Sequence, residues 1–131
     1  MIVVIPCGAR KLNHAAPAGQ LYTGPYHRMC ARYAHALAPP DKIFILSAKH
    51  GLLCLGDTIA PYSLTLGQPG SVTPGYVRRQ ATEMQILDEP CIALGGKAYT
   101  GLCRQVWRDC QTPLSGVGGQ GKQMGWMKAR L

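Results

Sequence analysis

Residues 43–51, IFILSAKHG, join an apolar run directly to a cluster of polar and reactive side chains. The four successive apolar residues from Ile43 to Leu46 indicate a strand buried on both faces, as in a parallel sheet. Two further runs, Ile2 to Ile5 and Cys91 to Leu94, have the same character. We therefore expect three short strands lying side by side and pointing the same way.

Helical patterns separate these strands. Apolar residues recur every three or four positions after Pro25, after Thr73-Pro74 and from Tyr99 to Val106. Proline suits the first turn of a helix and threonine suits an N-cap. The second of these helices is expected to run on to Leu87, and a short helix is expected over 123–129.

The segments 7–24 and 52–73 are rich in glycine, proline and polar residues and are expected to be loops. Strands alternating with helices predict an α/β fold with right-handed crossovers. The specific expectation is a small three-layer domain with a mostly parallel sheet of three or four strands. No linker divides the chain, so residues 1–131 are expected to form one domain.

The chain is basic, with 14 Lys and Arg against 6 Asp and Glu and a formal net charge of +8. This surplus favours a polyanionic partner, and we expect a nucleic acid or a nucleotide. The alternative is a basic protein without such a partner. No apolar segment approaches the roughly 18–20 residues that cross a membrane, and no signal peptide is recognisable. We expect a cytoplasmic protein that does not bind membranes.

The six cysteines form no CxxC pair and no Cys/His cluster with zinc-ligand spacing. We expect reduced thiols, because no export signal places the chain in an oxidising compartment. The few carboxylates form no pair at catalytic spacing, which disfavours magnesium-dependent chemistry. We therefore expect that the protein binds no metal and no cofactor.

Ligands of parallel α/β sheets collect at the carboxyl ends of the strands. In PCGARK, residues 6–11, Cys7 is a candidate nucleophile, because the positive charges of Arg10 and Lys11 would favour its thiolate form. Equally, Gly8 and the two cations can hold a phosphate. The structural alternative is a packed thiol beside two solvated charges.

The second strand leads into Ser47 and then Lys49-His50-Gly51. Lys49 is a candidate for a phosphate or carboxylate contact and His50 for a general acid or base. Gly51 allows a positive φ that turns the chain. The structural alternative is a turn with an exposed lysine and a locally bonded histidine.

Aromatic and glycine residues in other loops are further candidates for ligand contacts. Tyr62 can stack on a base or close a pocket. The segment LYTGPY, residues 21–26, adds Tyr22 and Thr23, and the third strand ends in Gly96-Lys97. The alternative for the tyrosines is ordinary loop packing.

Residues 116–122, GVGGQGK, match the GxxxxGK pattern of a P-loop, but no strand precedes them and Gln123 stands where Ser or Thr should follow. A flexible glycine-rich loop is the simpler interpretation. Basic residues are frequent from Lys97 onward, and four of them are candidates for nucleic-acid backbone contacts: Arg104, Arg108, Lys122 and Lys128.

Six segments together carry a family resemblance: PCGARK (6–11), LYTGPY (21–26), LSAKHGLL (46–53), IAPYSLTL (59–66), LGGKAY (94–99) and PLSGVGGQGKQMGWMK (113–128). The chain resembles a short uncharacterised domain of bacteria and phages, which is similar to the YaaA-like peroxide-stress proteins. The resemblance implies an α/β domain associated with DNA protection or nucleic-acid metabolism.

Three functions fit these observations. The first is a nucleic-acid-related domain that holds a nucleotide or extruded base and acts on the nucleobase or glycosidic bond, with His50, Lys49 and Cys7 as catalytic residues. The second is a non-enzymatic basic module that binds DNA or RNA backbones. The third is a small-molecule enzyme with a Cys7 nucleophile.

Overall fold

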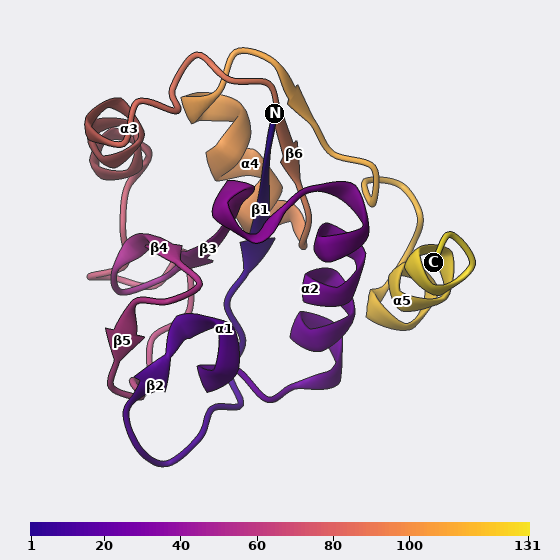
Figure 1. Cartoon of the computed structure of the whole chain (residues 1–131), viewed down its shortest axis with the longest axis horizontal. Coiled ribbons are helices and arrows are strands. Elements are labelled where there is room, and N and C mark those ends of the chain that lie inside the picture. The colour runs from indigo at the N-terminus through magenta and orange to yellow at the C-terminus, as the bar shows by residue number, and fades with distance from the viewer.

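A five-stranded sheet and four long helices dominate the computed structural model, which describes residues 1–131 (Figure 1). The strands are β1 (Ile2–Pro6), β2 (Ala16–Pro17), β3 (Ile43–Ser47), β4 (Gly51–Cys54), β5 (Thr58–Ile59), β6 (Cys91–Ala93) and β7 (Cys110–Gln111). The helices are α1 (Ala18–Leu21), α2 (Pro25–Leu37), α3 (Pro74–Glu83), α4 (Lys97–Val106) and α5 (Gln120–Lys128), with a 3₁₀ turn at Pro40–Lys42.

The three predicted strands form the centre of the sheet, whose order is β4-β3-β1-β6-β7. Strand β1 pairs in parallel with both neighbours, so that Val4 lies beside Phe44 of β3 and Ala93 of β6. The residues of β1 and β3 are buried throughout. The predicted α/β fold with a mostly parallel sheet is therefore confirmed.

The strand count was predicted wrongly, because the sheet has five strands and not three or four. Gly51 has a φ of +72°, which reverses the chain at once and pairs Gly51 with Ser47. The following strand, β4, runs antiparallel to β3 and buries Leu52 and Leu53. Residues 52–54 and 58–59 are thus strands within a segment expected to be a loop.

The helices form two contacting pairs (Figure 1). Helix α2 packs on β1 and on α5, whereas α3 packs on α4 and on β4. Thr73 caps α3 as expected, since its hydroxyl accepts the N–H of Tyr76 at 3.2 Å. Helix α3 ends at Glu83 and not at Leu87, because Gln85 takes a φ of +61°. No helix combines the length and apolar character that crossing a membrane requires.

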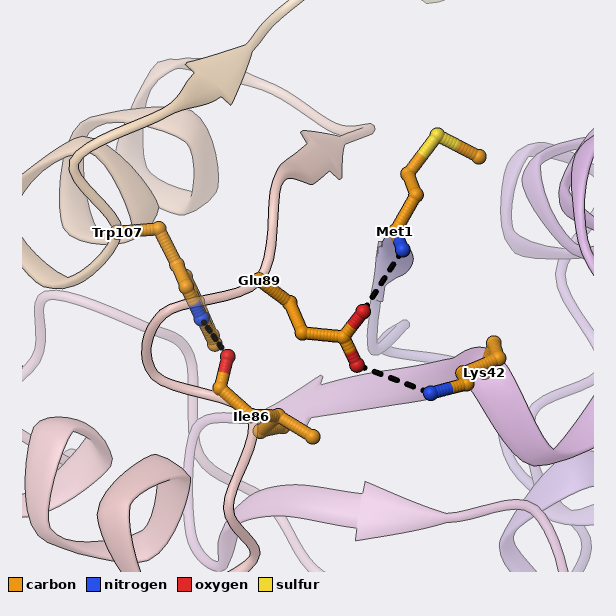
Figure 2. A network of polar contacts seen from close by, with 5 residues as sticks. All are labelled: Met1, Lys42, Ile86, Glu89 and Trp107. Carbon is orange, nitrogen blue, oxygen red and sulfur yellow. Dashed lines mark hydrogen bonds and ion pairs between the residues drawn. The ribbon is translucent and has the colours of Figure 1, made fainter.

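Glu89 bonds to residues that precede the other two central strands, at the amino ends of the sheet (Figure 2). Its carboxylate accepts hydrogen bonds from the Met1 amino group at 2.7 Å and from Lys42 Nζ at 2.9 Å. Met1 precedes β1, Lys42 precedes β3 and Glu89 itself lies two residues before β6. The nearby indole of Trp107 is 1% exposed and donates to the Ile86 carbonyl at 3.1 Å. These contacts link the segments that precede the three central strands.

Candidate functional site

The carboxyl ends of β1, β3 and β6 meet at the other end of the sheet. Pro6 pairs with Leu46, and the N–H of Cys7 donates to the Leu46 carbonyl at 3.1 Å. A Cβ on Gly95 would lie 3.2 Å from the Cβ of Pro6, so glycine permits the close approach of the segments after β1 and β6. The predicted convergence of the strand ends is confirmed.

A cavity of about 460 Å³ opens beside Cys7, and we call it the aromatic cavity. Tyr26 of α2, Tyr99 of α4 and Met124 of α5 contribute to its walls. The Cys7 sulfur lies 3.1 Å from the Tyr99 hydroxyl. Among the predicted site residues, this cavity brings together four: Cys7, Gly8, Arg10 and Gly96.

Arg10 and Lys11 are held next to the aromatic cavity by a short backbone pairing. The N–H of Thr23 donates to the Arg10 carbonyl at 2.9 Å, and Lys11 forms a β-bridge with Tyr22. Lys11 Nζ lies 4.4 Å from the centre of the Tyr62 ring, a cation–π contact. Arg10 lines the cavity and no Asp or Glu does, so the local charge is positive.

Three hydroxyl groups form a chain behind Cys7. Ser47 Oγ lies 2.7 Å from Tyr62 Oη, which lies 2.6 Å from Tyr22 Oη. Ser47 Oγ already accepts the N–H groups of Lys49 and His50, at 3.2 and 3.0 Å. With both lone pairs used, Ser47 donates to Tyr62. Either hydroxyl can be the donor in the bond between Tyr62 and Tyr22.

Burial is the main cause of the high pKa values of the two tyrosines in this group of three hydroxyls. Burial raises the pKa of Tyr22 to about 12 and that of Tyr62 further. The negative charge of a Cys7 thiolate would add to both increases. Both tyrosines are therefore neutral donors at physiological pH.

His50 and Lys49 lie on the turn between β3 and β4 and do not line the aromatic cavity. The His50 ring meets the Tyr62 ring edge-on, with 5.6 Å between centroids, and the His50 carbonyl accepts Gln80 Nε2 at 2.9 Å. Burial and then the charge of Lys49 lower the pKa of His50. His50 thus contacts Tyr62, which does not line the aromatic cavity either. Lys49 is exposed.

His27 is a site residue that the sequence analysis missed. It is 3% exposed, lines the aromatic cavity and has Nδ1 2.6 Å from the Pro6 carbonyl. Because a carbonyl only accepts, Nδ1 carries the proton and Nε2 is an acceptor. Burial lowers the pKa of His27 and keeps it neutral. Its helical spacing from Cys30 and Ala34, on the buried face of α2, was the available signal.

A second cavity of about 350 Å³ lies between α4 and the glycine-rich loop, and we call it the basic cavity. Lys97, Gly101 and Arg104 line one side of it from a single face of α4. The other side is lined by Leu114, Ser115, Gly116 and Gly118, with Leu114 as the only hydrophobic residue. The Arg104 guanidinium donates to the Thr112 hydroxyl. No carboxylate lines this cavity either.

The other residues predicted for nucleic-acid contacts are dispersed. Arg108 lines a separate cavity of about 390 Å³ that also contains Asp88 and Asp109. Lys122 and Lys128 lie exposed on α5. Of the four, only Arg104 faces a cavity at the carboxyl edge of the sheet.

No group of three or more His, Cys, Asp or Glu side chains is placed to bind a metal ion. The strand ends and the two cavities define a basic α/β domain whose candidate site combines aromatic, thiol, imidazole and cationic groups. The chain belongs to DUF6884, a family of unknown function, whose profile matches residues 2–129. No curated protein and no solved structure matches the chain significantly. The resemblance to YaaA-like proteins stays a prediction.

Proposed function

We propose that this domain binds a nucleotide, or a base extruded from a nucleic-acid strand, in the aromatic cavity. The supporting observation is a cavity at the carboxyl edge of the sheet with aromatic and apolar walls, a cation and no carboxylate. Tyrosine rings can stack on a base, which is worth about 1–3 kcal/mol. The Arg10 guanidinium is suited to a phosphate oxygen. In this proposal the two helix pairs are the outer layers of a three-layer domain.

The proposal extends to a reaction at the nucleobase or its glycosidic bond, for which the base must lie outside a stack. Cys7 lines the aromatic cavity, whereas His50 contacts the ring of Tyr62. We assign direct contact with the ligand to Cys7. His50 would act through Tyr62, and Lys49 would contact phosphate from the exposed turn. His27 would offer Nε2 as an acceptor for a ligand N–H or O–H group.

A thermal-shift screen of nucleosides, nucleotides and short oligonucleotides tests the binding proposal. A ligand at 100 times its dissociation constant should stabilise the protein by about 2.7 kcal/mol. Arg10→Gln should reduce the shift given by nucleotides. Arg32→Gln is the matched control, because Arg32 is exposed on α2 and does not line the cavity. The proposal fails if no compound in the screen shifts the melting temperature.

A second candidate is a non-enzymatic module, favoured by the net charge of +8 and by exposed Lys49, Lys122 and Lys128. Binding would then fall with salt, and Lys49→Ala would lower the slope of log K against log salt by about 0.9, the value for one phosphate contact on duplex DNA. His50→Ala would change neither binding nor any activity. A loss of turnover in His50→Ala would exclude this module.

A third candidate is an enzyme with Cys7 as nucleophile, favoured by the position of its thiol in the aromatic cavity. Cys7 is 7% exposed, whereas Cys54 is an exposed thiol. An activated Cys7 would react with iodoacetamide near neutral pH before Cys54 does. Labelling of Cys54 first would exclude this candidate, and peptide mass spectrometry distinguishes the two outcomes.

A further inference from the structure

The aromatic and basic cavities meet at one residue. Gly96 lines both, and it is the N-cap of α4 with an extended backbone, φ −75° and ψ −177°. A Cβ built on Gly96 would meet no atom within 4 Å. The space in front of Gly96 is therefore open, and a glycine is not needed there for the backbone conformation. A ligand that occupied both cavities would pass in front of Gly96.

The chemistry of the two cavities differs on either side of this junction. The aromatic cavity has tyrosine, proline, leucine and methionine side chains in its walls. The basic cavity has glycines, Ser115 and two cations, Lys97 and Arg104. Apolar ring faces suit a base, whereas cations, a hydroxyl and glycine backbone suit phosphate oxygens. The two environments match the two ends of one molecule.

We infer that the two cavities form a single bipartite site for a phosphorylated nucleoside, with the base in the aromatic cavity and the phosphate beside Lys97 and Arg104. The inference rests on the proposed function and adds that the ligand carries a phosphate, which binds in the basic cavity. Arg104 is oriented by its bond to Thr112. Lys97 makes no hydrogen bond or ion pair through its side chain, so its ammonium group is available to the phosphate.

Isothermal titration of the full chain with the four common nucleosides and their 5′-monophosphates tests the inference. At least one monophosphate should bind about tenfold more tightly than its nucleoside, the expected gain from one charged contact. Lys97→Gln should reduce this difference, since Arg104 remains, and leave the affinity for the nucleoside unchanged. Arg79→Gln is the control, since it removes the same charge from an exposed position on α3 outside both cavities.

Gly96→Leu provides a second test, because its side chain would enter the open junction without backbone strain. This substitution should weaken the binding of the monophosphate more than the binding of the nucleoside. A 5′-phosphorylated oligonucleotide, compared with its unphosphorylated form, shows whether the phosphate belongs to a free nucleotide or to a strand end.

The outcomes separate the two proposals. Equal affinity for nucleoside and monophosphate in the wild-type protein overturns the bipartite site and leaves the proposed function standing. The bipartite site is also overturned if Arg79→Gln lowers the phosphate gain as much as Lys97→Gln does, since only net charge would then matter. If no nucleoside, nucleotide or oligonucleotide binds, both proposals fail.

Discussion

Gly51→Ala should destabilise the protein strongly, because Gly51 has a positive φ and because a neighbouring side chain leaves no room for a Cβ there. At a φ of +72° an alanine is in the left-handed region, which costs about 1–2 kcal/mol. The added Cβ would also lie 2.1 Å from Gln80 Oε1. Gln80 would have to leave, although its side chain accepts the Leu52 N–H at 2.8 Å and donates to the His50 carbonyl at 2.9 Å.

Each of these two hydrogen bonds contributes about 1 kcal/mol, so the total loss should be about 3–4 kcal/mol. For a chain of this size the melting temperature should fall by roughly 10–15 °C. Urea unfolding followed by tryptophan fluorescence gives the free energy of unfolding directly. A melting temperature within roughly 3 °C of the wild type would refute the conclusion that an alanine at this position is strained and displaces Gln80.

A double-mutant cycle with Gln80→Ala separates the two contributions. Gln80→Ala alone should cost about 2 kcal/mol, the value of the two lost bonds. In its background Gly51→Ala should cost only the backbone strain, about 1–2 kcal/mol. The double mutant should therefore be no less stable than Gly51→Ala alone. Full additivity would show that the alanine does not displace Gln80.

Three further outcomes are expected. Tyr62→Phe should lower the free energy of unfolding by about 2 kcal/mol in urea titrations, because Ser47 and Tyr22 both lose their hydroxyl partner. An unchanged stability would contradict the hydrogen bonds among these three hydroxyls. The protein should lose stability as pH falls below 6.5, the ordinary pKa of histidine, because His27 binds a proton more readily in the unfolded chain, and melting curves of His27→Gln should show a shallower loss. Gly125→Ala should raise stability by about 0.5–1 kcal/mol, since it lies within α5 and a Cβ there meets no atom within 4 Å; a lower melting temperature would contradict this.

The sequence predicted the central strands well because their signals are local. Ile2–Ile5 and Ile43–Leu46 are continuous apolar runs bounded by proline or by polar residues, and such runs have few alternatives to burial in a sheet. Proline at the start of α2 and α3 likewise determines where each helix begins. The positions of Cys7 and Gly96 at one edge followed from the parallel order of the strands.

Strand β4 was missed because its signal depends on a neighbour. Residues 51–54 are too few to show a period, and they become a strand only because β3 offers an unpaired edge. The end of α3 is similar: Met84 and Leu87 continue a helical spacing, but the chain leaves the helix after Glu83. Pairing and packing overrode the local pattern at both places.

The sequence by itself determined the three central strands, the starts of α2 and α3 and the positive charge of the domain, because apolar runs, prolines and charged residues are read directly from the chain. Only the tertiary structure decided which side chains share a cavity. The hydroxyls of Tyr22 and Tyr62 are 40 residues apart and meet because β2, which precedes Tyr22, pairs with β5, which precedes Tyr62. His27 faces the cavity because α2 packs on β1, and Lys97 comes to lie across from the glycine-rich loop. Contacts between distant segments depend on how the elements stack, and no local pattern records that stacking.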